Sequence, residues 1–164
     1  MTDWAVVHEK FVEQFRNGWD RPDPHAWDVF IDESTHFVQP MLREGVGSKL
    51  WWEESQRTLQ LLPDLRADVL AWSGVEETLF IHLRFSATLA GKPLTWEAVD
   101  LIRLTPDGVA ICRESFFDSV PTALTLLRRP RSWLPWWRSG VGPLFWRRRL
   151  LRPVPTMATT GDPR

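Results

Sequence analysis

The chain has 164 residues, 43% of them hydrophobic, which suffices for one domain with a sizeable core. Its single cysteine, Cys112, excludes an internal disulfide, and no stretch reaches the roughly 20 apolar residues that a spanning helix needs. The net charge of −1 hides an asymmetry: residues 1–127 hold 20 acidic against 11 basic residues, whereas residues 128–164 hold nine arginines against Asp162 alone. We therefore expect an acidic domain over 1–127 and a basic extension over 128–164, disordered from about residue 153. The N-terminus has no basic segment followed by an apolar run, so a cytoplasmic location is expected.

The first 62 residues show helical patterns interrupted by turn-forming residues. Apolar residues recur at three- and four-residue steps from Trp4 to Trp19, which indicates an amphipathic helix that ends near Gly18. In chain order we then expect a short helix over 25–31, a strand over 35–39, a loop at 45–47, and a helix over 49–62 with Ser48 as its N-cap.

The middle of the chain alternates apolar and polar residues, which is typical of half-buried strands. We expect strands over 65–72, 78–89, 93–104 and 109–117, joined by turns at 73–74, 90–92 and 105–108 and followed by a short helix over 121–127. Helices that precede a run of antiparallel strands indicate an α+β domain, with the helices packed on one face of a curved sheet.

The turn at 105–108 also predicts a register. If Leu104 pairs with Val109, then Asp100 lies opposite Arg113, and the apolar face of these two strands is interrupted only by Asp100, Arg113 and Ser115. A shift by one residue would turn every side chain to the other face.

Several segments resemble the nuclear transport factor 2-like superfamily and, within it, the SnoaL-like proteins. They are Phe-Val-Gln-Pro40, Leu-Pro-Asp-Leu-Arg66, Ala-Val-Asp-Leu-Ile-Arg-Leu104 and Glu-Ser-Phe-Phe-Asp118. The resemblance covers about residues 4–127. It implies a cone-shaped α+β barrel, with N-terminal helices in the concave face of a curved, mostly antiparallel sheet, an apolar pocket, and often a homodimer. Members include ketosteroid isomerases, polyketide cyclases, epoxide hydrolases, dehydratases and proteins without catalysis, so function depends on the site.

The catalytic positions of these relatives are retained unevenly. The resemblance places the general base of the ketosteroid isomerases at Gln39, their oxyanion-hole tyrosine at Phe11 and their protonated oxyanion-hole acid at Asp100. The acid that epoxide hydrolases and SnoaL-like cyclases carry on the last strand falls on Ser115. Gln39 and Ser115 cannot replace carboxylates as general acids or bases. Asp100 is thus the one candidate catalytic residue.

Asp100 has two interpretations. An unpaired carboxyl in an apolar pocket would favour its protonated form and could donate a hydrogen bond to a ligand oxygen. If Arg113 faces it, the ion pair keeps Asp100 charged and gives it a structural or ligand-orienting role, which we favour. The expected ligand-binding residues are those on the same face or at the pocket mouth: Phe11, Gln39, Leu83, Phe85, Ile102, Arg113, Ser115 and Phe117.

No cofactor or metal is expected. The four histidines lack the spacing of a metal site, and the chain contains neither a phosphate loop nor a dinucleotide fingerprint.

The basic extension interleaves arginine with tryptophan, a combination that suits a membrane–water interface. Three contacts are considered for it: its own acidic body or a dimer partner, an anionic membrane, and, least favoured, nucleic acid. The residues expected to make a membrane or partner contact are Trp133, Trp136, Trp137, Trp146, Arg147, Arg148 and Arg149.

Two functions follow from this sequence. The first is binding of a small hydrophobic molecule of steroid or polyketide type, with Asp100 serving an isomerase, cyclase or lyase (hydratase-type) reaction that needs no cofactor. The second is a ligand-binding or scaffolding module without catalysis, brought to a membrane surface or a partner by its basic extension. The absent tyrosine and absent base favour the second slightly.

Overall fold

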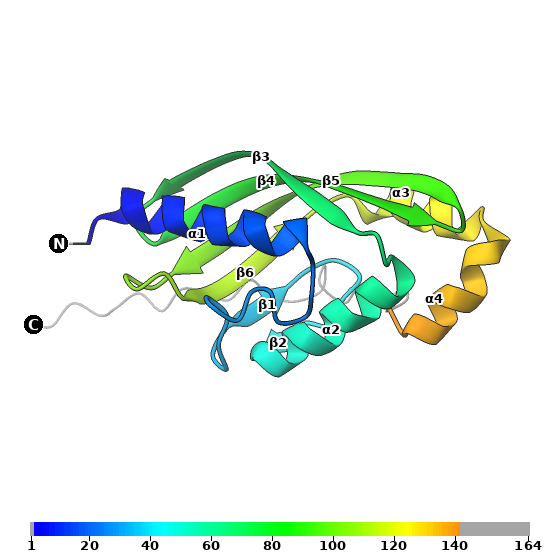
Figure 1. The fold of residues 1–164 in the computed structure, drawn as a ribbon, viewed down its shortest axis with the longest axis horizontal. Coiled ribbons are helices and arrows are strands. Elements are labelled where there is room, and N and C mark those ends of the chain that lie inside the picture. Colours follow the sequence, from blue (N-terminus) through cyan, green and yellow to red (C-terminus); the bar gives the residue numbers. More distant parts are fainter. Residues whose placement is uncertain (1, 142–164) are drawn as a thin grey trace, which may run out of the picture.

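The computed structural model describes residues 2–141, and the predicted disorder beyond residue 153 lies outside this range, as do Trp146, Arg147, Arg148 and Arg149. The described chain forms one mixed six-stranded sheet in the order β2-β1-β6-β5-β4-β3, accompanied by helices (Figure 1). The elements run α1 (Trp4–Asp20), β1 (His36–Val38), β2 (Gly45–Val46), α2 (Ser48–Leu61), β3 (Arg66–Val75), β4 (Thr78–Leu89), β5 (Lys92–Leu104), β6 (Ala110–Phe116), α3 (Ser119–Leu127), η1 (Pro130–Ser132) and α4 (Trp133–Ser139).

All neighbouring strands pair antiparallel except β1 and β6, which pair in parallel. The helices α1 and α2 lie on one side of the sheet, while α3 and α4 gather at one end of the molecule, beside the C-terminal end of α2 (Figure 1). The fold predicted from sequence, an α+β sheet with helices against its concave face, is confirmed. No helix among residues 2–141 is long and apolar enough to cross a membrane.

The core is dominated by aromatic rings that α1 directs against the sheet. Its helical spacing buries Phe11, Phe15 and Trp19, as a 3.6-residue period requires for an apolar stripe. The ring of Phe11 lies 4.3 Å from that of Phe30, and the ring of Trp19 lies 4.8 Å from that of Trp27. This packing fills the part of the cone beneath α1.

Four local predictions were wrong. Residues 25–31 form consecutive turns instead of a helix, although Trp27, Phe30 and Ile31 are buried as expected. Gly45–Val46, expected in a loop, is a short strand because it pairs with β1. Gly47, not Ser48, is the N-cap of α2, since the Ser48 hydroxyl donates to Glu33 instead.

The turn expected at Ser73–Gly74 was the fourth error. Both residues continue the ladder of β3, opposite Phe80 and Leu79, and the chain reverses at Glu76–Glu77. A glycine is needed at position 74 for a different reason. A Cβ there would lie 2.4 Å from the buried His8 ring, so the glycine lets α1 approach β3 closely.

Candidate ligand-binding site

A buried polar group interrupts the apolar face of β5 and β6. Arg113 donates from Nε to an Asp100 carboxylate oxygen at 2.8 Å, and its Nη2 lies 2.7 Å from the same oxygen. Ser115 donates to the other oxygen at 2.6 Å, and Gln39 accepts from Arg113 Nη1 at 3.2 Å. Asp100, Arg113 and Ser115 are all buried, and burial of charges is tolerated when they are paired and hydrogen-bonded in this way. The predicted ion pair of Asp100 with Arg113 is therefore present. The predicted register is wrong, since Asp100 lies opposite Ser115 in the sheet and not opposite Arg113.

The Arg113 side chain is also held by aromatic rings. Its guanidinium carbon lies 4.9 Å from the ring centroid of Trp51, on α2, and 5.8 Å from that of Phe15. Such stacking suits the planar, delocalised guanidinium. The Arg113 side chain is thus held between the carboxylate of Asp100 and the rings of Trp51 and Phe15.

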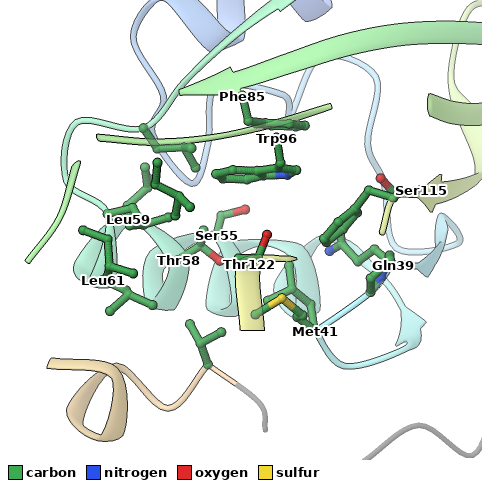
Figure 2. A pocket seen from close by; sticks show the side chains of 18 of the residues that line it. Gln39, Met41, Ser55, Thr58, Leu59, Leu61, Phe85, Trp96, Ser115 and Thr122 are labelled. Atoms are coloured by element: carbon green, nitrogen blue, oxygen red, sulfur yellow. The ribbon is translucent and has the colours of Figure 1, made fainter. Parts of the chain in front are cut away.

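A cavity of about 130 Å³ lies on the other side of Arg113, toward α2, α3 and α4. It is lined mainly by apolar side chains of the sheet and of these helices, and Gln39, Arg113 and Ser115 bring polar atoms to one side of it (Figure 2). Asp100 does not line the cavity, because Arg113 and Ser115 lie between its carboxylate and the open space.

One wall of the cavity is a flat aromatic surface. The rings of Phe85 and Trp96 are parallel to within 9° at a centroid distance of 4.9 Å, and the other side of Trp96 faces the cavity (Figure 2). Two hydroxyls, of Ser55 and Thr122, lie across from this ring (Figure 2). Within residues 2–141 neither hydroxyl has a hydrogen-bond partner, whereas Thr58 donates to Glu54.

The loop that closes another side of the cavity is fastened to α2. It contributes Met41 and Leu42 to the lining, and Met41 adopts a left-handed backbone conformation with φ of 69°, a strained choice for a side chain with a Cβ. Arg43 holds this loop through Nε, which donates to buried Glu54 at 2.7 Å. Hydrogen bonds to Glu54 and then to Glu53 raise the pKa of Arg43.

The last part of the described chain completes the cavity. Leu126 from α3, Trp136 from α4 and Val141 line it. Arg129 anchors this segment to the turn between β4 and β5, because its guanidinium donates to the carbonyl oxygens of Leu89, Lys92 and Pro93 at 3.0–3.1 Å.

The structure brings together some of the predicted site residues and separates others. Gln39, Phe85, Arg113, Ser115 and Phe117 line the cavity. Phe11 and Ile102 instead border a void of about 10 Å³ on the other side of Arg113, too small for more than one water. Leu83 is buried in the core away from both. These three residues do not line the cavity, because the α1 aromatics fill that part of the cone.

Sequence reasoning missed the contribution of the helices after β6. Thr122 and Leu126 carried no polar or catalytic signal, and Trp136 was expected at a membrane or partner contact because it lies in the basic extension. A partly buried Trp136 packed against the core indicates that at least this tryptophan folds back onto the body. Trp137 beside it is exposed.

No metal-binding cluster of His, Cys, Asp and Glu exists among residues 2–141. Half-buried His82 and exposed Arg84 both donate hydrogen bonds to Glu97 on the outer face of the sheet. These hydrogen bonds, that of Arg84 more than that of His82, lower the pKa of Glu97. This group lies on the surface, away from the cavity.

The chain matches no protein-family model and no curated protein sequence. Solved structures do share its fold. A protein with a ketosteroid isomerase-like fold from Catenulispora acidiphila, in complex with trimethylamine, superposes with a TM-score of 0.65 at 13% identity, over 76% of this chain and 96% of that one. A candidate SnoaL-like polyketide cyclase from a Jannaschia species gives 0.60 at 14% identity, over 73% and 92%.

TerC, co-crystallised with polyporic acid, gives a TM-score of 0.64 at 16% identity, over 71% of this chain and 95% of that one. The chain therefore has the cone-shaped α+β fold of the nuclear transport factor 2-like superfamily, shared with SnoaL-like and ketosteroid isomerase-like proteins, as its sequence predicts.

Proposed function

We propose that this protein binds a small, flat, largely apolar molecule in the cavity beside Trp96. The observation that carries the proposal is an aromatic platform that two hydroxyls, of Ser55 and Thr122, face across an otherwise apolar space. Neither hydroxyl has a hydrogen-bond partner in the described part of the chain. Apolar walls with a few convergent polar groups are the general character of small-molecule sites. Ring stacking on Trp96 would orient the ligand, and the hydroxyls would select one that carries an oxygen or nitrogen.

The size of the cavity limits the ligand. A volume of about 130 Å³ is close to the roughly 150 Å³ of an engineered apolar cavity in another protein that admits benzene. A single-ring ligand fits this space, whereas a steroid or a multi-ring polyketide would need the α3–α4 wall to move outward. Two proteins of the same fold are described with small molecules bound, trimethylamine and polyporic acid, which supports ligand binding as the role.

For Asp100 the proposed role is positioning. Both of its oxygens accept hydrogen bonds, from Arg113 and Ser115, and the fully buried carboxylate does not border the cavity, so a ligand there does not reach it. An acid that donates to a ligand oxygen would need its proton on an oxygen that faces the cavity. This geometry favours the binding module over an isomerase, cyclase or lyase that uses Asp100 as its acid.

A second copy of the chain is the proposed partner of the outer sheet face. That face exposes apolar side chains on three neighbouring strands, among them Phe80, Val99 and Phe116, and contiguous apolar surface of this kind often marks an interface. Sedimentation equilibrium of wild type against Phe80→Ser/Phe116→Ser tests the dimer, and a monomeric wild type would contradict it.

The binding proposal is tested with the full chain purified under gentle conditions. Native mass spectrometry is expected to show a retained small molecule, and a library of single-ring ketones, quinones and phenols is expected to contain members that raise the melting temperature. A protein that retains nothing and responds to no member, while remaining folded, would contradict the proposal.

A further inference from the structure

The segment from α3 to residue 141, here called the cap (residues 119–141), has two different faces. Its inner face closes the ligand cavity through Leu126 and Trp136 and is anchored by Arg129. Its outer face exposes large apolar side chains. On α4 these are Trp133, Leu134 and Trp137, the last with 79% of its surface accessible, and on α3 they are Val120, Leu124 and Leu127.

The spacing of apolar residues explains why α3 has both an exposed apolar face and a buried one. On α3, Val120, Leu124 and Leu127 recur at four and three residues, so they form one stripe, which lies about a quarter of a turn round the helix from buried Ala123 and Leu126. An apolar stripe that faces solvent costs free energy in the isolated protein, since it stays in contact with water. Exposed apolar surface of this extent indicates a partner.

The charge of the cap identifies the kind of partner. Residues 119–141 contain four arginines and no acidic residue. Arg128, Arg131 and Arg138 are exposed, and none of them makes an ion pair within residues 2–141. Glu53 borders the same surface hollow as Arg138, but its carboxylate is engaged by Arg43.

We propose that the outer face of the cap docks on an anionic lipid bilayer. Exposed indole rings favour the headgroup region, and guanidinium groups bind anionic headgroups. Short helices with proline at positions 121, 130 and 135 would lie in the interface plane and insert their apolar side chains to a shallow depth. Four further arginines, at positions 147, 148, 149 and 152, continue the positive charge in the sequence.

A bilayer fits this surface better than the alternatives. Nucleic acid would bind the arginines and its bases could stack on tryptophan. It would leave the aliphatic stripe of Val120, Leu124 and Leu127 without an apolar contact. A second copy of this chain would have to present acidic and apolar groups in a matching pattern. Docking would also bring the cavity wall formed by Leu126 and Trp136 toward the lipid, although the proposal does not depend on what the cavity binds.

Co-sedimentation of the full chain with vesicles tests this inference. Wild type is expected to pellet with vesicles of phosphatidylglycerol and phosphatidylcholine in equal parts and to stay in solution with phosphatidylcholine alone. Arg128→Gln/Arg131→Gln/Arg138→Gln is expected to weaken binding about a hundredfold, since each basic residue near such a surface contributes about 1 kcal/mol, which is about fivefold. The matched control, Arg16→Gln/Arg21→Gln/Arg103→Gln, removes the same charge from exposed arginines outside the cap and is expected to bind within about twofold of wild type.

The apolar contribution is tested separately. Leu134→Ser/Trp137→Ser is expected to lower binding to anionic vesicles about tenfold and to reduce the quenching of tryptophan fluorescence by brominated lipid. Both side chains are exposed, so circular dichroism and melting temperature should match wild type.

Three results would overturn the inference. One is equal pelleting of the cap variants and the arginine control. The second is absence of lipid binding by wild type together with self-association that the cap substitutions abolish, which would assign the face to a second copy. The third is tight binding of single-stranded nucleic acid without binding of vesicles.

Discussion

Arg113 and Asp100 form an ion pair across β5 and β6 although they are not direct partners in the sheet. Asp100 lies opposite Ser115, and Ile102 lies opposite Arg113, so the guanidinium reaches its carboxylate diagonally. Ser115 donates to the second carboxylate oxygen from the directly opposed position. Every acceptor and charge of this buried pair is therefore engaged, which is the condition for tolerating it in a core.

Asp100→Asn is expected to destabilise the protein strongly, because it leaves the buried Arg113 charge without its partner. Loss of one partner from a buried pair costs about 3–5 kcal/mol in the free energy of unfolding. Urea denaturation at neutral pH measures the change. The double variant Asp100→Asn/Arg113→Met should recover part of the loss, since it removes the unpaired charge as well.

The surface pair Arg84–Glu97 provides the matched control for this prediction. Both side chains are about half exposed, and they interact at 3.0 Å. Glu97→Gln should cost far less than Asp100→Asn, because water solvates the remaining arginine. Equal losses in the free energy of unfolding for Asp100→Asn and Glu97→Gln would contradict the prediction that removing one partner costs more in a buried pair than in an exposed one.

The register of β5 and β6 shows what the sequence could and could not predict. The pairing expected from the turn differs from the observed one by two residues at Asp100. Leu104 pairs with Ala110 instead of Val109, and the irregularity between Arg103 and Leu104 adds the second residue. An even shift leaves each β5 side chain on its predicted face, so Asp100, Arg113 and Ser115 are buried together as expected. Ile111 alternates with Arg113 and Ser115 and so belongs to the predicted apolar face, but it is exposed, since the irregularity puts Ala110 in the core instead. The alternation of apolar and polar residues predicts which face of the sheet a side chain lies on. A bulge leaves no signal in the composition, so its position could not be predicted.

The position of the cavity could not be predicted for a different reason. Pocket walls and core positions are both apolar, so Phe11, Leu83 and Ile102 satisfied the same pattern as Phe85 and Phe117. Which part of the cone remains open depends on how far the α1 rings fill it. It also depends on the helices after β6, whose docking rests on long-range contacts such as those of Arg129.

Gly18→Ala is expected to destabilise the protein although alanine favours helices. A Cβ at position 18 would lie 2.4 Å from Trp27 Nε1, and Trp27 is buried. Overpacking of a core costs about 1–3 kcal/mol, which exceeds the gain of about 1 kcal/mol in helix propensity. Chemical denaturation measures the loss. The loss in the free energy of unfolding should be smaller in a Trp27→Phe background. A Gly18→Ala protein that is more stable than wild type would contradict the observed approach of α1 to Trp27.

Asp64→Asn is expected to change the pH dependence of stability. Hydrogen bonds from the side chain and backbone of Thr88 lower the pKa of Asp64 below its ordinary value of 3.8. A lowered folded-state pKa gives stabilisation that is complete above the unfolded value and disappears as the pH falls through the folded value. The variant should therefore be less stable than wild type at pH 7, and the two should converge in acid.

Melting temperatures measured between neutral pH and pH 2 test this convergence. Asp68→Asn serves as the control, because Asp68 is exposed and accepts no hydrogen bond among residues 2–141. A constant difference between wild type and Asp64→Asn at every pH would rule out the contribution of the ionised carboxylate.

Trp96→Ala is expected to weaken ligand binding more than it weakens the fold. Trp96 is half-buried and stacks on Phe85 at the cavity wall, and an aromatic pair contributes about 0.5–1.5 kcal/mol beyond its buried area. Loss of the platform should reduce the affinity for a ring-containing ligand about tenfold or more. Isothermal titration with a ligand identified by melting-temperature screening measures it, and Phe80→Ala on the outer sheet face is the control.

Ser55→Leu distinguishes a ligand site from a packing defect. Ser55 lies on α2 with its hydroxyl toward the cavity (Figure 2), so a leucine there would occupy the space that a ligand needs. Filling an apolar cavity should raise the free energy of unfolding of the ligand-free protein by about 1 kcal/mol. The same change should abolish binding of the ligand. Gln56→Leu, one residue further along on the exposed side of α2, adds similar volume outside the cavity and should leave binding intact. If Ser55→Leu stabilises the protein and still binds the ligand with wild-type affinity, the ligand occupies another part of the molecule.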